Sequence, residues 1–246
     1  MSKSTLWCNY EVKKPHEICL KGVLILYGYS MEFRAHLVSW QDIEKWCSAI
    51  REQVVDSFSP EVIIGLSRGG LVPSRILSDS LWIKDLLSIK TEHWGITATK
   101  SGHAVLNDPG KLNLTGKKVL IVDDITDTGQ SMKLAYDFVR SQDPADIKTA
   151  TMLHITRSEF VPDFYGELVD QKQWTWFIFP WNVYEDLDNL LMKAMKNKLS
   201  LSGIKSLLLD EYDLDIANSH LEKVLKDFVR SGKLREESQN YVKVGK

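Results

Sequence analysis

The stretch that decides the fold is KVLIVDDITDTGQS, from Lys118 to Ser131. Its first half is a run of β-branched and aliphatic residues, too short for a helix and typical of a buried strand. Asp123 and Asp124 follow at the carboxyl end of that strand, where open α/β sheets place their ligands. After Thr128-Gly129-Gln130-Ser131 a helical pattern begins, with apolar residues at Met132, Ala135, Tyr136 and Val139.

This stretch combines two binding chemistries. Paired carboxylates suit a diol, and the amide groups and hydroxyls at a helix N-terminus suit a phosphate without needing a cationic side chain. A phosphorylated ribose carries both groups. The alternative is a structural turn whose acid caps the helix, which is common for a single Asp. Three acids between Asp123 and Asp127, beside a phosphate-shaped loop, favour ligand binding.

The order of apolar strand, Asp-Asp, two residues and Asp-Thr-Gly-x-Ser resembles the 5-phosphoribosyl 1-pyrophosphate signature of type I phosphoribosyltransferases. The resemblance implies an α/β fold with a mainly parallel sheet flanked by helices. It implies that Asp127 transfers the proton of the purine and that Asp123 and Asp124 hold the ribose hydroxyls. The implied ribose and 5′-phosphate site comprises Asp123, Asp124, Asp127, Thr128, Gly129, Gln130 and Ser131.

A second informative stretch, EVIIGLSRGGLVP, runs from Glu61 to Pro73. A buried strand again enters a glycine-rich turn and a helix, and glycines let a backbone approach a ligand closely. Beside the first motif, it resembles the pyrophosphate loop of the same family, whose Ser-Arg-Gly-Gly form is typical of the 6-oxopurine branch. The resemblance implies pyrophosphate binding by Ser67, Arg68 and Gly69, mainly through the backbone, and a cis peptide at Ser67–Arg68. The Arg68 side chain could equally be a solvated surface charge.

A strand is expected at 86–90, followed by a long polar passage from 91 to 116. Compact domains rarely hold so long a loop unless it is functional or disordered. The resemblance implies a lid that excludes water from the reacting sugar. Lys90, His93 and Lys100 are candidates to contact pyrophosphate, although each is expected more often to be solvated.

Strands are expected at 148–155 and 174–179. The second resembles the segment that covers the purine in the xanthine-guanine branch, which assigns Trp176 to stacking and the Phe177 backbone to hydrogen bonding. For Trp174 and Phe179 we expect core positions.

The base preference depends on one departure from the family pattern. The 6-oxopurine enzymes place a lysine near the end of the strand after the signature helix, where it donates to the O6 carbonyl. Here the aligned nucleobase position is Ile155. Because adenine presents an amino donor instead, the pocket is expected to favour adenine. A slip of one residue would place His154 there, and Arg157 is a further possible donor.

The resemblance covers residues 31–182, which we expect to form the phosphoribosyltransferase domain. Residues 1–30 fit poorly, so we expect Met31 to be the true start and the extension to be an over-extended reading frame or a loose tail. The intact mass of the natively expressed protein would test this. Residues 183–246 show three helical stripes and are expected to form a small bundle, as in certain crenarchaeal adenine phosphoribosyltransferases. The closing strands could instead form the wing of a winged helix.

Composition sets further limits. The 246 residues carry 31 Lys and Arg against 33 Asp and Glu, and the tail alone is balanced at eleven each, so no nucleic-acid or membrane partner is expected. The spacing of Cys8, Cys19 and Cys47 shows no metal or disulfide pattern, which favours the reducing cytoplasm. The apolar run from Val23 to Tyr27 is too short for a membrane span.

The sequence therefore predicts a purine phosphoribosyltransferase, with adenine favoured, that uses 5-phosphoribosyl 1-pyrophosphate and a free base. Mg²⁺ is expected to be carried mainly by the pyrophosphate. The related enzymes often have an acid after Pro-Trp, which is Asn182 here, so no protein metal ligand is assigned. Alternatives are a hypoxanthine, guanine or xanthine acceptor, and a regulator that binds the donor and uses a winged-helix-like tail on nucleic acid. A homodimer is expected.

Overall fold

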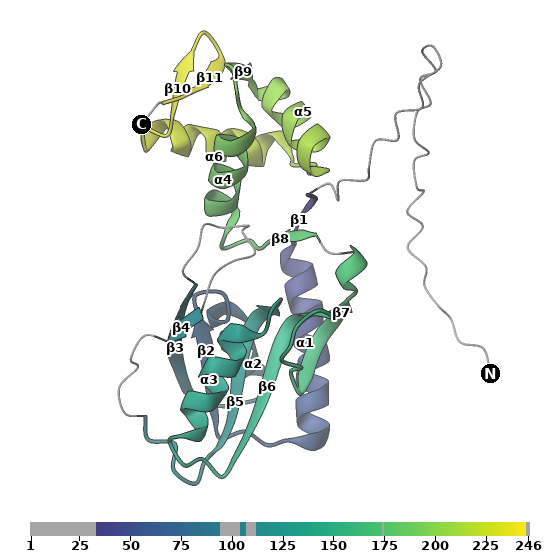
Figure 1. Cartoon of the computed structure of the whole chain (residues 1–246), viewed down its shortest axis with the longest axis vertical. Helices are drawn as coiled ribbons and strands as arrows, with labels where there is room; N and C mark the ends of the chain where they lie inside the picture. The colour runs from purple at the N-terminus through teal and green to yellow at the C-terminus, as the bar shows by residue number, and fades with distance from the viewer. Residues whose placement is uncertain (1–32, 94–103, 107–111, 174, 245–246) are drawn as a thin grey trace, which may run out of the picture. The chain divides into compact units, whose positions relative to one another are not determined.

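A computed structural model describes residues 33–93, 104–106, 112–173 and 175–244, and Figure 1 shows its elements. Over these residues the central feature is a six-stranded sheet in the order β4-β3-β2-β5-β6-β7. All neighbouring strands are parallel except β3 and β4, which confirms the expected mainly parallel α/β sheet. The strands are β2 (Val62–Ser67), β3 (Asp85–His93), β4 (Ala104–Leu106), β5 (Lys118–Thr126), β6 (Asp146–Ile155) and β7 (Phe164–Val169).

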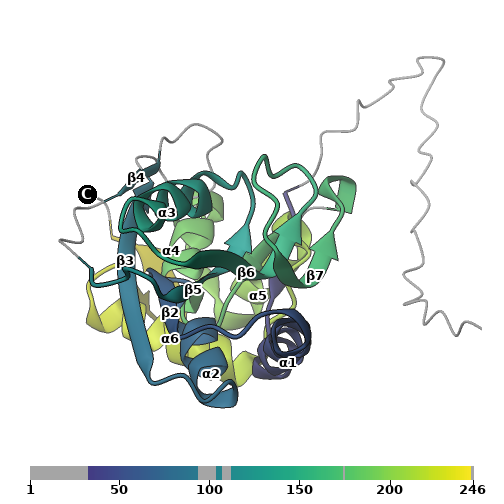
Figure 2. The same cartoon turned by 90° about the horizontal axis from the view of Figure 1, so that it is seen from below.

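Helices cover both faces of this sheet, as Figure 2 shows. Helices α1 (Trp40–Ser57) and α2 (Leu71–Ser80) pack on one face, and α3 (Gln130–Arg140) packs on the other. The side chains of alternate residues of β5 lie on opposite faces of the sheet. Leu120 and Val122 pack with α1 and α2, whereas Ile121 packs with α3. Burial on both faces explains why this strand is apolar throughout.

The start of α1 is fixed by a capping box. The N–H of Asp42 donates to Ser39 Oγ at 3.1 Å, and the N–H of Ser39 donates to Asp42 Oδ2 at 2.9 Å. Each side chain thus satisfies a backbone donor of the other residue at the helix end.

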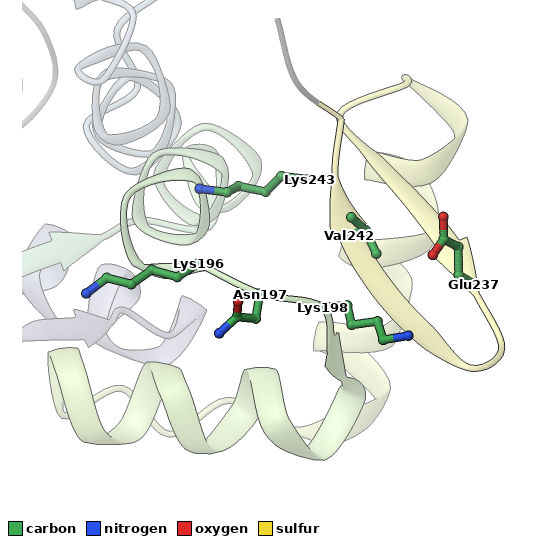
Figure 3. Close-up of a pocket in the computed structure, with 6 residues that line it drawn as sticks. All are labelled: Lys196, Asn197, Lys198, Glu237, Val242 and Lys243. Atoms are coloured by element: carbon green, nitrogen blue, oxygen red, sulfur yellow. The ribbon is translucent and has the colours of Figure 1, made fainter.

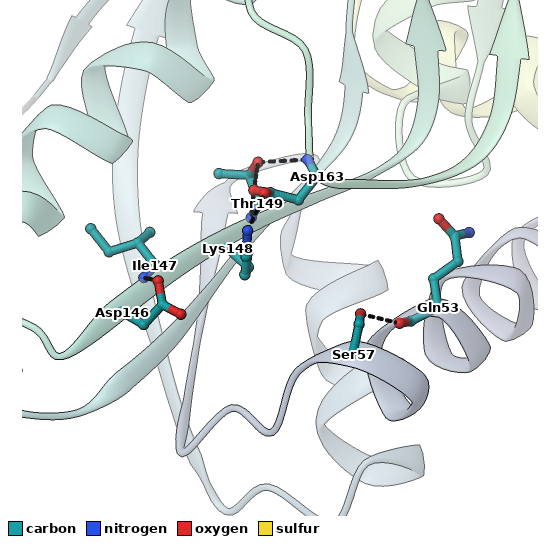
Figure 4. Close-up of polar contacts among 7 residues, drawn as sticks. All are labelled: Gln53, Ser57, Asp146, Ile147, Lys148, Thr149 and Asp163. Atoms are coloured by element: carbon teal, nitrogen blue, oxygen red, sulfur yellow. Dashed lines mark hydrogen bonds and ion pairs between the residues drawn. The ribbon is translucent and has the colours of Figure 1, made fainter.

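The link between β6 and β7 is fixed by Asp163, as Figure 4 shows. Its carboxylate accepts from Lys148 Nζ at 2.8 Å and from the N–H and hydroxyl of Thr149, both at 2.9 Å. Thr149 is fully buried, so these bonds satisfy polar groups that water does not reach. Strand β7 was not anticipated because, as an edge strand packed on α1, its pattern is short and mixed; a 3₁₀ turn, η1 (Gln171–Gln173), follows it.

The expected lid is partly a hairpin. Strand β3 extends to His93, beyond the expected end at Lys90, and pairs antiparallel with β4 in the register Thr91↔Leu106. Residues 91–116 are therefore not a continuous loop, because Ala104–Leu106 complete a ladder with the end of β3. The lid candidate Lys100 lies in 94–103, outside the described residues, as do 107–111.

The tail contains the three expected helices and also a sheet. Its elements are α4 (Val183–Ala194), β9 (Leu199–Ser200), α5 (Leu201–Tyr212), α6 (Asn218–Arg230), β10 (Leu234–Glu237) and β11 (Asn240–Lys243). The antiparallel order β10-β11-β9 adds a small sheet to the expected helices, which agrees with the winged-helix alternative. The sheet forms because Leu234 and Tyr241 bury their side chains against the helices, and the element order is that of a winged helix.

One strand pair joins the tail to the rest of the described chain. Strand β1 (Ala35–Leu37) lies parallel to β8 (Trp176–Ile178). Ala35 and Ile178 belong to the apolar core of the tail, so residue 182 does not divide two separate cores. Residues 1–30 lie outside the described part of the chain. Among the described helices, none has the length and apolar character needed to cross a bilayer.

Candidate active site

The two sequence motifs meet at a switch point of the sheet. From β2 the chain passes through α2 to β3 on one side, whereas β5 lies on the other side of β2 and continues into α3 on the opposite face. In such sheets a crevice forms outside the carboxyl ends of the two strands where the winding reverses. The loop after β2 and the acidic end of β5 both lie there.

The acid pair ends β5 in a nearly buried position. Asp123 and Asp124 are each 9% exposed. Asp123 Oδ1 accepts from the N–H of Asp124, and Asp124 Oδ1 accepts from the N–H of Ile125, both at 2.9 Å. Burial raises the pKa of both carboxyls, and the charge of Asp124 raises the pKa of Asp123 further. Two acids held this way favour a ligand that brings hydroxyl donors or positive charge.

The loop after β2 touches this pair. The Ser67–Arg68 peptide bond is cis, as expected. A Cβ added at Gly69 would lie 1.9 Å from Asp124 Oδ2, so only glycine lets the backbone and the carboxylate approach this closely. The Arg68 side chain is 72% exposed and pairs with Glu185 of α4 at 2.6 Å, so the backbone is the part of this residue that lies at the acid pair.

Replacing Gly69 by alanine is expected to lower activity by about tenfold to a hundredfold, because the added methyl displaces Asp124 and small misplacements near a site are costly. Steady-state kinetics with circular dichroism would measure this. The matched control is Gly203→Ala on α5, where the new Cβ meets its nearest neighbour at 3.4 Å. Equal activity of the two variants would contradict the prediction.

The first turn of α3 is the place where the sequence predicts an anion site. Gly129 is the N-cap, with φ of 81°, and the first turn carries no acidic residue. A Cβ at Gly129 would lie 2.6 Å from both Phe160 Cβ and Ser158 Oγ, so glycine is required by space as well as by conformation. The carbonyl of Thr128 accepts from the N–H of Glu159 at 3.2 Å, which holds the loop in place. The positive end of the helix dipole is thus presented beside the acid pair.

Asp127 has a partner that the motif alone did not indicate. Arg157 donates through Nε to Asp127 Oδ1 at 2.6 Å and through Nη2 to Oδ2 at 2.5 Å. The two residues are 30 apart in sequence and meet because β5 and β6 are neighbours. The sequence indicated Arg157 as a possible donor to the base, but it did not indicate the pairing of Arg157 with Asp127.

The aligned nucleobase position, Ile155, is fully buried at the end of β6. The neighbouring candidate His154 is also buried, its Nδ1 lies 3.0 Å from Thr126 Oγ1, and burial lowers its pKa. The side chain of Ile155 offers no hydrogen-bond donor, and the ring of His154 is engaged with Thr126.

The expected base-covering segment is β8 and the chain after it. The N–H of Trp176 donates to the Arg34 carbonyl, and the N–H of Val38 donates to the Ile178 carbonyl, so by alternation the peptide groups of Phe177 point away from β1. The Trp176 ring stacks on Phe33, with centroids 6.1 Å apart. Phe179 is 2% exposed and belongs to the core as expected, whereas Trp174 lies outside the described residues.

Two acids of α4 were not anticipated at the site. Besides Glu185, which pairs with Arg68, Asp186 is 3% exposed and its Oδ2 has no hydrogen-bond partner among the described residues. The pKa of Asp186 is raised to about 6, mainly by burial and also by the charges of Glu185 and Asp124. A hydrogen bond from Trp176 acts in the opposite direction and lowers this pKa. The charge of Asp124 thus acts on Asp186.

Asp186 makes stability depend on pH. Because its pKa of about 6 lies above the ordinary value of 3.8, its stabilising contribution is complete below pH 3.8 and is lost as the pH rises through about 6. Asp186→Asn should therefore raise the free energy of unfolding by about 2 kcal/mol more at about pH 8 than at about pH 4.5. Urea unfolding at both pH values measures this, with Asp210→Asn as control. A difference of the opposite sign would refute it.

The tail has a hollow of about 500 Å³ of its own, shown in Figure 3. In that view the side chain of Lys198 extends to the opposite side from those of Lys196 and Lys243, and Lys243 Nζ donates to the Met192 carbonyl. Because the three ammonium groups do not point toward one common position, they are not arranged to bind one ligand group. The acidic end of β5 is therefore the stronger candidate site.

Comparison with known proteins agrees with this geometry. The chain is 29% identical over 151 residues to a xanthine-guanine phosphoribosyltransferase of Idiomarina loihiensis, covering 61% of this chain and 89% of that protein. It is 31% identical over 153 residues to one of Cereibacter sphaeroides, covering 59% and 86%. A purine phosphoribosyltransferase structure from Pyrococcus horikoshii matches with a TM-score of 0.52 and 29% identity, over 61% of this chain and 94% of that one. The phosphoribosyl transferase domain model matches residues 32–187. The chain belongs to the phosphoribosyl transferase domain family.

Proposed function

We propose that the protein transfers a phosphoribosyl group from 5-phosphoribosyl 1-pyrophosphate to a 6-oxopurine base, hypoxanthine, guanine or xanthine. The observation that carries the reaction is the contact of Gly69 with Asp124, which brings the proposed pyrophosphate loop against the proposed ribose-binding acids. The choice of base is supported by relatives named for xanthine, guanine and hypoxanthine. These names do not support the adenine preference expected from the sequence.

The reaction exchanges one bond at the anomeric carbon. The bond from C1′ to the pyrophosphate oxygen breaks, the bond from C1′ to N9 of the base forms, and the base loses a ring proton. In this proposal Asp127 receives that proton. The Asp123 and Asp124 carboxylates hold the ribose hydroxyls and stabilise positive charge on the sugar, while the start of α3 holds the 5′-phosphate.

We also propose that Mg²⁺ accompanies the donor. Among the described residues no group of three or more His, Cys, Asp or Glu is placed to hold a metal. Mg²⁺ keeps several waters and takes few protein ligands, so the pyrophosphate oxygens are its expected main ligands. The ion would neutralise charge on the leaving group.

Adenine is the second candidate acceptor, and the specific observation behind it is the buried, apolar Ile155. A discriminating assay supplies the donor, Mg²⁺ and one of hypoxanthine, guanine, xanthine or adenine, and measures pyrophosphate release. Turnover of the oxopurines with little turnover of adenine is expected. Turnover of adenine alone would reverse the choice.

A regulator is the candidate of another class, and the winged-helix order of the tail is the observation behind it. Two cations on α6 are neutralised by acids on the same helix, Lys226 by Glu222 at 2.8 Å and Arg230 by Asp227 at 2.9 Å, which disfavours a phosphate backbone as partner. Salt-sensitive DNA binding without base-dependent pyrophosphate release would establish the regulator instead.

We further propose a homodimer that functions in the cytoplasm. Trp82 is 88% exposed, and Val55 on α1 is 56% exposed. Large exposed apolar side chains of this kind are the ones that subunit interfaces cover. Light scattering on the purified protein would give the mass in solution, and a monomer would contradict the proposal.

A further inference from the structure

The position of the acceptor base follows from the order of the strands. The proposed pyrophosphate loop follows β2, and the proposed ribose site follows β5. β6 lies beside β5 on the side away from β2, as Figure 2 shows. A group that displaces another at a sugar carbon arrives on the face opposite the one that leaves. For the proposed transfer, this order of strands puts the expected position of the incoming base over the carboxyl end of β6.

The charged group at that end is Arg157. Its loop is held at both sides: the N–H of Ser158 donates to the Ile155 carbonyl at 2.9 Å, and the N–H of Thr156 donates to the Val169 carbonyl at 2.9 Å. The guanidinium side chain is 27% exposed and is fixed by its two bonds to Asp127. Because the planar guanidinium is already held by a carboxylate, it loses little side-chain conformational entropy when a ligand binds.

We propose that Arg157 selects the base by donating a hydrogen bond to the exocyclic oxygen at C6. The proposal rests on the proposed phosphoribosyl transfer and names the group that recognises a 6-oxopurine in a pocket where Ile155 presents none. Asp127 is then both the anchor of the guanidinium and the acceptor of the ring proton.

The chemistry of the two purine types explains the selection. At C6, guanine and hypoxanthine present a carbonyl acceptor, whereas adenine presents an amino donor. A guanidinium is always charged and only donates. Opposite adenine it would meet the amino group, leaving donors on both sides unsatisfied in a half-buried site.

The test compares bases within each protein. Values of kcat/KM for hypoxanthine and adenine, at saturating donor and Mg²⁺, are measured for the wild type, Arg157→Gln, Arg157→Lys and the control Arg230→Gln. Arg230 also pairs with an aspartate but lies on α6. Glutamine offers a carbonyl acceptor, so Arg157→Gln is expected to lower the hypoxanthine-to-adenine ratio by about 10- to 100-fold. Lysine keeps a donor, so Arg157→Lys should retain most of the preference.

Using the ratio separates base recognition from a general loss of activity, because both bases need Asp127 equally. Equilibrium binding of inosine and adenosine monophosphates to each variant gives the same ratio without turnover. A ratio that stays within about threefold of the wild type in Arg157→Gln would overturn the assignment while leaving phosphoribosyl transfer intact. A wild-type protein that uses adenine and not hypoxanthine would overturn the proposed acceptor and this assignment together.

Discussion

Replacing Asp123 and Asp124 together by asparagine is expected to lower kcat/KM by about 10³-fold, the scale on which loss of transition-state charge stabilisation is felt. The two carboxylates lie where the ribose hydroxyls and the developing positive charge are proposed to be. Asparagine keeps their size and an acceptor oxygen but removes the negative charge. Steady-state kinetics with varied donor would measure the loss.

The same variant is expected to be at least as stable as the wild type. Burial holds the pKa of both carboxyls above the ordinary value, so the stability they contribute is present at low pH and lost as the pH rises through the raised pKa values. Removing both charges relieves this cost at neutral pH, in keeping with the trade-off between stability and activity at functional sites. The control is Asp143→Asn, an exposed change in a turn with φ of 58°. A double variant that loses stability, or keeps its activity, would show that the pair is structural.

The second large effect is expected at Asp127. Asp127→Asn should lower kcat by about 10³-fold, within the range for loss of a general base, with little change in the KM for the donor. An amide can still accept a hydrogen bond from Arg157 but cannot take up the ring proton. Single-turnover measurements would separate chemistry from binding. If the loss appeared in KM with kcat unchanged, Asp127 would be a binding residue only.

The local patterns predicted most of the sheet because each is complete within a short stretch. The apolar run before Asp123 predicts a strand buried on both faces, and β5 is such a strand, with α3 beginning at Gln130. The glycine-rich turn after β2 was likewise visible, and the resemblance to the family's pyrophosphate loop added the cis peptide at Ser67–Arg68. A motif whose residue types are set by the local backbone conformation can be recognised from a single sequence.

Contacts between residues that are far apart in the sequence could not be predicted from it. The bonds of Arg157 to Asp127 join two loops, and Arg68 meets Glu185 across 117 residues. Strand β1 has only three residues, so its pairing with β8 left no periodic signal. The preference for adenine was inferred from Ile155, whereas the guanidinium of Arg157 at this end of β6 is held in place by Asp127, which follows the neighbouring strand β5.

The shared core beneath β1 and β8 has a consequence for how this chain can be divided or recombined. Ala35 and Ile178 place their side chains among those of the tail, so cutting after Asn182 would strip an apolar surface from the strand that is expected to cover the base. A chimaera that joins this tail to another phosphoribosyltransferase would have to include β1 and β8 as well, so that the apolar core of the tail stays covered.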